Sequence, residues 1–263
     1  MSDFLYRYSV VDDHSLDGLE KSEFYFATPT NFNDPFDCKN LFTFEGSDDN
    51  DWRSFFDMQL QHQEPHLSLQ ERRRKLEKIV RDGMYKDSDT RKEQLRIWGK
   101  TLEEESNKLG IVCLSQKPDD ILMWSHYSDK HRGFCLKFDK KIIEKKFYCR
   151  DVKYCPIYPT FTEYIAQSRN KKLHETFLLT KSIHWKYEEE YRLINDPSSR
   201  PDIPGERQYK YPEEALVGII WGCQMLERNK KMIEFILNKR KHSLDFFEAK
   251  KSENQYAIKI EPA

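Results

Sequence analysis

The sequence predicts an α+β fold with a central mixed or split antiparallel sheet and flanking helices. Three observations predict it. Short alternating segments rich in β-formers recur along the chain, helical segments separate them without regular strand–helix–strand crossovers, and the stretch at about 46–110 has mostly helical periodicity. A chain of 263 residues is long enough to bury a sizeable core. We therefore expect a single α+β domain over 1–263 with a helical insertion at about 46–110.

The first forty residues predict a strand, a short helix and a second strand. Residues 4–10 alternate and are rich in β-formers, residues 13–22 begin with capping side chains, and residues 23–28 are again β-prone. Pro29 ends the second strand, and 31–37 is rich in residues that form turns.

Regular structure is expected to resume after the insertion. We predict strands at 110–115, 133–138, 151–155, 185–194 and 215–221, with a final strand or hairpin over 244–260. We predict helices at 119–127, 160–183 and 226–240, and a loop at 198–212.

The charge balance excludes a global attraction to nucleic acid or membrane. Forty-four Lys and Arg residues nearly cancel 45 Asp and Glu residues, which gives a net charge of -1. Any such binding must therefore be local. The N-terminal residues lack a basic leader with an apolar run, and no apolar stretch approaches the ~20 residues of a membrane span. We expect a cytoplasmic protein without a membrane partner.

The cysteines predict buried, reduced thiols and no metal site. The six cysteines are scattered without a C-x-x-C pair. A zinc set of Cys113, His126, His131 and Cys135 is conceivable, but it lacks the usual paired-cysteine spacing.

The segment Trp185–Ile194 is the densest in chemically useful residues. As a strand it would place Glu188, Glu190 and Arg192 on one face, with alternate residues roughly 6.5–7 Å apart. Neighbouring carboxylates raise the pKa of at least one of them, and a nearby cation lowers it. As a helix, Glu188 and Arg192 would form an ordinary ion pair. The segment predicts a functional site without naming its reaction.

A second cluster spans 124–133. Its two histidines titrate near neutral pH. Ser125, His126 and Asp129 supply the residue types of a hydrolytic triad, but neighbouring side chains on a helix diverge. The alternative is that the aromatic residues pack while the histidines bond to local backbone groups.

Arg7, between Tyr6 and Tyr8, is a third candidate. An arginine flanked by aromatic rings at a strand end can hold a phosphate and stack on a base. The alternative is an edge strand with Arg7 in solvent. Glycine-rich dinucleotide and phosphate-loop motifs do not occur in the sequence.

Several short motifs resemble, in order, the bacterial family named domain of unknown function 2971. They cover most of the chain outside 46–110: Leu5–Tyr8, Leu16 with Leu19, Phe24–Pro29, Phe32–Asp37, Cys113–Ser115, Leu122–Tyr127, His131–Cys135 and Lys181–Ile194. The family name implies no activity.

The overall layout is also similar to that of ADP-ribosyltransferases, with an aromatic-basic first strand and a late Glu-x-Glu. That resemblance implies an NAD-consuming enzyme, a toxin or an anti-phage effector, in which a late carboxylate stabilises the developing positive charge on the ribose. It implies that Arg7 orients NAD, that Tyr25 or Thr28 lines the nicotinamide pocket, that Glu190 is catalytic and that Glu188 orients the acceptor. The full expected site comprises catalytic Glu190, Glu188 and His126 and NAD-binding Arg7, Tyr8, Tyr25, Thr28 and Arg192.

Two other functions remain open. Aromatic rings interleaved with arginines could make a non-catalytic module of a defence system that binds a nucleotide or nucleic acid. Alternatively, Glu188, Glu190, His126 and Asp34 could hold Mg²⁺ in a nuclease. The expected partners are a nucleotide-like small molecule and a nucleic-acid or protein acceptor.

Overall fold

The structure is a computed structural model that describes residues 2–38, 48–168, 177–195 and 207–263. Its contacts divide the chain into two compact units. The first unit comprises Met1–Asn31, Lys108–Tyr154 and Ile183–Ala263, and the second comprises Phe32–Asn107 and Cys155–Ser182. The expectation of a single domain stays a prediction.

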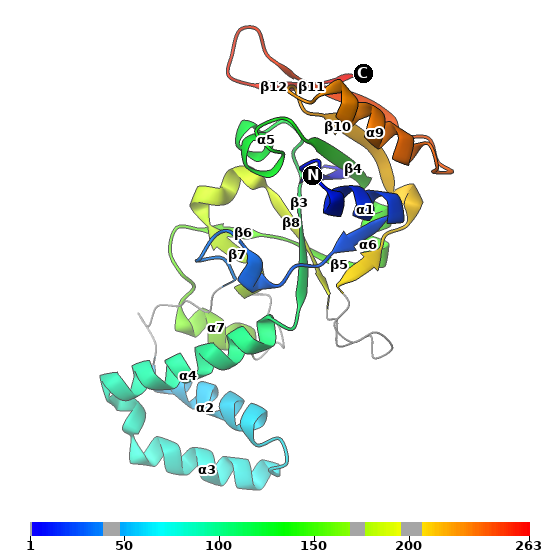
Figure 1. The fold of residues 1–263 in the computed structure, drawn as a ribbon. Helices are drawn as coiled ribbons and strands as arrows, with labels where there is room; N and C mark the ends of the chain where they lie inside the picture. Colours follow the sequence, from blue (N-terminus) through cyan, green and yellow to red (C-terminus); the bar gives the residue numbers. More distant parts are fainter. Residues whose placement is uncertain (1, 39–47, 169–176, 196–206) are drawn as a thin grey trace. The chain divides into compact units, whose positions relative to one another are not determined.

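An eight-stranded mixed sheet organises the first unit (Figure 1). Its strands, in spatial order, are β12 (Ile258–Pro262), β11 (Asp245–Lys251), β10 (Leu216–Trp221), β4 (Phe134–Asp139), β1 (Phe4–Ser9), β3 (Gly110–Ser115), β8 (Glu190–Asn195) and β5 (Tyr148–Asp151). β1 lies between β3 and β4 and is antiparallel to both. β10 and β11 are parallel and are connected through α9 (Glu227–Leu237). The predicted mixed sheet with flanking helices is confirmed.

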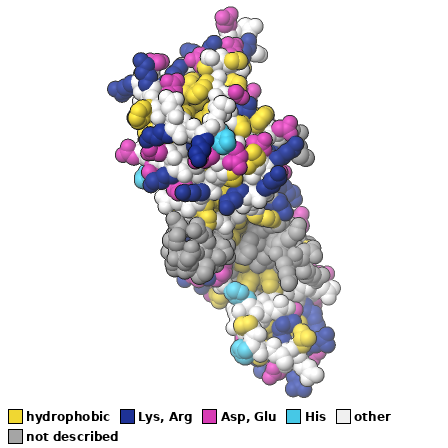
Figure 2. All heavy atoms as spheres, turned by 90° about the vertical axis from the view of Figure 1, so that its right-hand side faces the viewer, with side chains coloured by type: hydrophobic (Ala, Val, Ile, Leu, Met, Phe, Trp, Pro, Cys, Tyr) yellow, Lys and Arg dark blue, Asp and Glu magenta, His cyan; other side chains and the backbone are white. Residues whose placement is uncertain are grey.

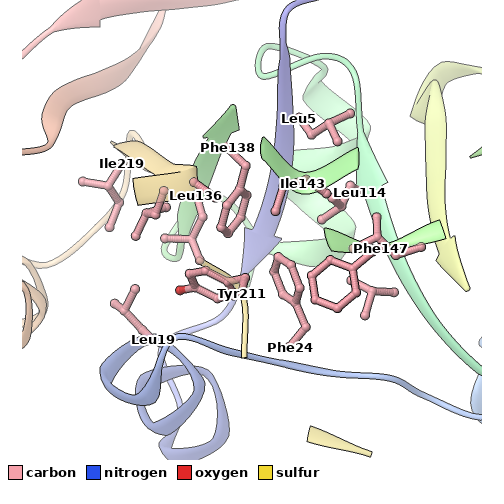
Figure 3. Close-up of a cluster of buried hydrophobic side chains, with 14 of the residues drawn as sticks. Leu5, Leu19, Phe24, Leu114, Leu136, Phe138, Ile143, Phe147, Tyr211 and Ile219 are labelled. Carbon is pink, nitrogen blue, oxygen red and sulfur yellow. The ribbon is translucent and has the colours of Figure 1, made fainter. Parts of the chain in front are cut away.

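The larger core lies on one face of this sheet, which we call the α1 face. It is covered by α1 (Asp13–Lys21), α6 (Lys140–Lys146), α9 and a small antiparallel sheet of β2 (Glu23–Tyr25) and β9 (Gln208–Lys210). Figure 3 shows Phe24 and Tyr211 side by side beneath the strands, with Leu19 reaching from α1. The Phe24 and Tyr211 ring centroids are 4.7 Å apart. Burial of such large rings stabilises a chain that is otherwise poor in aliphatic residues.

The opposite face, which we call the α5 face, carries a smaller core beneath α5 (Ile121–Tyr127). Alternation along β1 sends Leu5 to the α1 face and Tyr6 and Tyr8 to the α5 face. There Tyr8 meets Trp124 edge to face, with centroids 5.1 Å apart. Asp120 begins α5 by accepting hydrogen bonds from the next backbone N–H groups.

The second unit is largely helical. It contains α2 (Asp49–Gln63), α3 (Leu69–Asp82), η2 (Met84–Lys86), α4 (Ser88–Ser106), α7 (Phe161–Ser168) and β7 (Thr180–Ser182). Its aromatic core includes Trp52, Phe55 and Trp98, and the indole N–H of Trp98 donates to the Tyr164 hydroxyl at 2.6 Å. Helices therefore occupy the stretch predicted as an insertion.

Several boundaries differ from the sequence-based expectation. The predicted helix at 160–183 is wrong at its end, because Thr180–Ser182 is a strand; residues 169–176 of that prediction lie outside the described residues. The predicted strand at 185–194 is wrong in its first half, where the chain forms the 3₁₀ helix η3 (Ile183–Glu188). The sequence analysis missed α6, β5 and β9, and the strand predicted at 151–155 corresponds to β6 (Lys153–Cys155). A further 3₁₀ turn, η1 (Pro29–Asn31), follows β2, and η5 (Glu213–Ala215) precedes β10.

The described surface carries side chains of both charge signs. On the side shown in Figure 2, acidic and basic side chains are intermingled. Among the described helices, none is long and apolar enough to cross a membrane.

Candidate functional site

A pocket lined by an arginine opens on the α1 face of the sheet. Its volume is about 490 Å³, within the range of about 300–1,000 Å³ common for small-molecule sites. Its lining includes Arg7, His14, Ser15, Tyr25, Gln208 and Tyr211. The walls thus combine a cation, hydroxyl and amide groups, and aromatic rings, and we call this cavity the Arg7 pocket.

Local sequence explains how these side chains meet. Arg7 follows Leu5 by two positions in β1, so it projects to the α1 face. Asp12 caps α1 by accepting a hydrogen bond from the backbone N–H of Ser15 at 2.8 Å, which fixes the first helical turn beside the end of β1. Tyr25 and Gln208 are register partners in the β2–β9 pair. Residues of β1, α1, β2 and β9 therefore build most of the lining.

Arg7 is the unusual group in this pocket. Its guanidinium lies over the Phe24 ring, 5.4 Å from the centroid. Burial lowers the pKa of Arg7, while Tyr211, Cys113 and Asp12 raise it, and an arginine remains charged despite such a shift. Within the described ranges, no side chain or carbonyl forms a hydrogen bond or ion pair with this guanidinium. Its N–H donors are therefore available to a ligand.

Two acidic side chains, Asp17 and Glu23, also line the Arg7 pocket. Asp17 is neutralised in part by Lys21, whose ammonium nitrogen lies 2.8 Å from a carboxylate oxygen. Carboxylates accept hydrogen bonds from hydroxyl and amino groups. The pocket therefore suits a ligand that carries an anionic group together with hydroxyl or amino groups.

Glu190 and Arg192 form a buried ion pair on the other face of the sheet. The Arg192 Nε donates to Glu190 Oε1 at 2.7 Å and Nη2 donates to Oε2 at 3.0 Å. Their side chains are only 3% and 0% exposed. Tyr191 and Leu193 belong to the α1-face core, so the alternating Glu190 and Arg192 project to the α5 face. The two-pronged pairing fixes both charges.

Glu188 does not share the strand face with Glu190 and Arg192 as predicted, because η3 ends at Glu188 and β8 begins at Glu190. Between them Glu189 adopts a left-handed backbone, with φ of 40°. Glu188 is instead fixed near α5, where the Tyr127 hydroxyl donates to its Oε1 at 2.7 Å. The Ser115 hydroxyl donates to the Glu188 carbonyl at 2.7 Å.

The other predicted site residues lie apart from the Arg7 pocket. The Tyr8 hydroxyl donates to the Lys117 carbonyl at 2.8 Å on the α5 face. Thr28 accepts from the Thr30 hydroxyl at 3.1 Å and does not line the pocket. His126 is exposed at the end of α5, with its ring beside Tyr127.

The structure therefore does not gather the predicted residues into one site. Of the predicted NAD-binding residues, Arg7 and Tyr25 line the pocket, whereas Glu190 lies across the sheet. The sequence analysis missed His14, Gln208 and Tyr211. His14 could have been identified as a candidate from its place in the first turn of a capped helix. Gln208 and Tyr211 could not, because they lie in a stretch that was predicted as a loop.

The metal-based alternative is not supported by a ligand cluster. Among the described residues, no group of three or more His, Cys, Asp or Glu side chains is arranged to hold a metal ion. Asp34 belongs to the second unit, where it accepts from the backbone N–H of Phe36 at 2.9 Å.

Part of the chain matches one known protein family. Residues 123–193 match the model of a family described as "Protein of unknown function (DUF2971)". The DUF2971 match runs from α5 into β8, so it includes the Glu190–Arg192 pair and excludes Arg7. It supports the resemblance drawn from the motifs. Comparison with curated proteins and with solved structures gave no match.

Proposed function

We propose that this protein binds a nucleotide-like small molecule in the Arg7 pocket. The observation that carries the proposal is the Arg7 guanidinium, which lines a pocket of about 490 Å³ and makes no ion pair with the described residues. A desolvated, unpaired cation is costly, and a phosphate would supply both the negative charge and the acceptors it lacks.

The other side chains that line the Arg7 pocket suit the sugar and the base of a nucleotide. Tyr25 is 49% exposed and offers a ring face on which a base can stack. Asp17, Glu23 and Gln208 offer acceptors for ribose hydroxyls or base amino groups. Phosphate, sugar and base would each meet a suitable group.

The geometry favours binding over the NAD-consuming transferase reaction. In the expected form of that reaction, Glu190 is the carboxylate beside the ribose. Glu190 lies on the α5 face and is held by Arg192, so it gives no support to catalysis in the Arg7 pocket. A nucleotide-binding module is therefore the function that the site supports best, and the transferase and its NAD requirement stay predictions.

The proposal can be tested by isothermal titration calorimetry, which measures the affinity of the protein for AMP, ADP, NAD and adenosine. We expect the phosphate-bearing compounds to bind and adenosine to bind at least tenfold more weakly. Arg7→Gln should weaken phosphate-dependent binding by roughly 10- to 100-fold, since a hydrogen bond to a charged group is worth about 1.5–3 kcal/mol.

Arg132→Gln is the matched control, because Arg132 is exposed and pairs with Asp129 at 2.8 Å. It should leave affinity unchanged, and circular dichroism should show both variants folded. Absence of binding by the unmodified protein, or equal binding by Arg7→Gln, would refute the proposal. Nicotinamide release from NAD that is lost in Arg7→Gln would instead establish an enzyme.

A further inference from the structure

The charged side chains that line the Arg7 pocket are unequal in number. Among the described lining residues, Arg7 is the one arginine or lysine, whereas Asp17 and Glu23 are two carboxylates. His14 is the other basic side chain in the lining, and a histidine adds a positive charge only when its ring is protonated. With a neutral His14, the pocket therefore offers one cation against two carboxylates.

The two carboxylates differ in how far they are neutralised. Asp17 is exposed on α1, and the ammonium nitrogen of Lys21 lies 2.8 Å from one of its carboxylate oxygens. Glu23 is partly buried at the start of β2 and makes no ion pair with the described residues. Burial weakens the screening of a charge by water. Glu23 is therefore the stronger source of negative potential in this pocket.

Neutral polar groups complete the lining. The hydroxyls of Ser9 and Ser15 and the side-chain amide of Gln208 can donate hydrogen bonds to phosphate oxygens without adding charge. Arg7 itself is partly buried in β1 and offers the N–H donors of its guanidinium. A phosphate in the Arg7 pocket would thus meet several donors but only one balancing charge.

The charge of a phosphate depends on its esterification. A phosphomonoester has a second pKa of about 6, so at pH 7.5 it carries almost two negative charges. A phosphodiester lacks that second acidic group and carries one. Arg7 can balance one charge, whereas a second would be repelled by Glu23 and Asp17. This repulsion is stronger in a partly desolvated pocket than in water.

We propose that the Arg7 pocket selects a nucleotide whose phosphate is a diester, a cyclic mononucleotide, over phosphomonoesters and over nucleoside di- and triphosphates. The inference rests on the proposed function of the Arg7 pocket and names its ligand class. A volume of about 490 Å³ lies in the lower half of the usual range of about 300–1,000 Å³, which suits a mononucleotide better than a dinucleotide. Arg7 balances the single charge, and Glu23 rejects a second one.

The test compares 3′,5′-cyclic AMP, AMP and ADP by isothermal titration calorimetry of the full-length protein. At pH 7.5 cyclic AMP should bind at least about fivefold more tightly than AMP, and ADP should bind more weakly than AMP. At pH 5.5 AMP is mostly a monoanion, so the ratio of the two affinities should fall toward one. Protonation of the titratable groups in and beside the lining affects both ligands, so the ratio isolates the phosphate charge; these groups are His14, Asp17, Lys21, Glu23, Tyr25 and Tyr211.

Glu23→Gln tests the residue that sets the selectivity. At pH 7.5 it should strengthen AMP binding at least about threefold and change cyclic AMP binding less, because it removes the charge that repels the second phosphate charge. Glu253→Gln is the matched control, since it removes the same charge from the exposed turn between β11 and β12, outside the lining. The control should leave the ratio unchanged, and circular dichroism should show both variants folded.

The outcomes separate this inference from the proposed function. AMP that binds as tightly as cyclic AMP at pH 7.5, or a ratio that is independent of pH, overturns the diester selectivity and leaves nucleotide binding in place. Equal ratios in Glu23→Gln and Glu253→Gln overturn the role of Glu23. Absence of binding by all three nucleotides removes the proposed function and this inference together.

Discussion

Arg7 and Arg192 are two desolvated arginines on opposite faces of one sheet, and they differ in what neutralises them. Arg192 is fully buried and grips Glu190 through two hydrogen bonds of 2.7 and 3.0 Å. Arg7 lines a pocket, contacts the Phe24 ring, and makes no ion pair with the residues described. Arg192 is therefore paired with an anion of the protein itself, whereas the donors of Arg7 are available to the anion of a ligand.

The two arginines should therefore affect different properties of the protein, its stability and its ligand binding. A buried ion pair adds little net stability, yet removing one partner leaves the other as an uncompensated buried charge. An unpaired cation beside a cavity differs, because its desolvation costs free energy that only a bound anion offsets. Stability should therefore depend on Glu190 and Arg192, and binding on Arg7.

Glu190→Gln should have the largest effect on stability. Loss of the carboxylate charge removes the anion that accepts from Nε and Nη2 of the buried Arg192, so the free energy of unfolding should fall by about 3–5 kcal/mol. Urea denaturation followed by circular dichroism measures it. The double variant Glu190→Gln/Arg192→Met should regain part of the loss, because it removes the uncompensated cation.

Glu189→Gln is the matched control for that experiment. Glu189 pairs with Lys117 at 2.5 Å, but both side chains are more than 40% exposed. An exposed pair contributes about 0–1 kcal/mol, so this variant should be nearly as stable as the unmodified protein. Equal stability of Glu190→Gln and Glu189→Gln would show that the Glu190–Arg192 pair is not structural.

Tyr127→Phe should have an intermediate effect. It deletes the hydroxyl that donates to Glu188 at 2.7 Å. Loss of a hydrogen bond to a charged group should lower the free energy of unfolding by about 1.5–3 kcal/mol, measured by the same urea titration. Tyr256→Phe serves as the control, since Tyr256 is fully exposed. No difference between the two variants would argue against a structural role for the Glu188 contact.

Arg7→Met should have the smallest effect on stability. It removes a desolvated cation while retaining an apolar stem, so the free energy of unfolding should stay within about 1 kcal/mol of the original value or rise. Arg192→Met, which removes the cation that contacts both Glu190 carboxylate oxygens, should instead lose about 3–5 kcal/mol. A loss of similar size in Arg7→Met would make Arg7 a structural residue and would remove the contrast between the two arginines.

The sequence predicted individual elements well where local patterns determine them. Segments rich in β-formers predicted β1 and β3. The acidic residues before α5, among them its N-cap Asp120, predicted where that helix begins. These signals are local, because side-chain alternation and capping involve residues a few positions apart. The crowded segment before Ile194 was also recognised, although its functional role stays a prediction.

The arrangement of the site could not be predicted in the same way. Alternation shows which residues of one strand share a face, but it does not show how the faces of different strands correspond. Arg7 and Glu190 were therefore grouped although they project in opposite directions. The left-handed Glu189 has no local sequence signal, and β9 is formed by pairing with β2, which lies far away in the sequence.

The central place of β1 has a consequence for synthesis on the ribosome. This strand leaves the ribosome well before its neighbours β3 and β4, which come from residues 110–115 and 134–139. At bacterial or eukaryotic elongation rates of about 5–20 residues per second, both edges of β1 stay unpaired for on the order of ten seconds. During that interval the nascent chain presents Leu5, Tyr6 and Tyr8 on a segment whose native neighbours have not yet been synthesised.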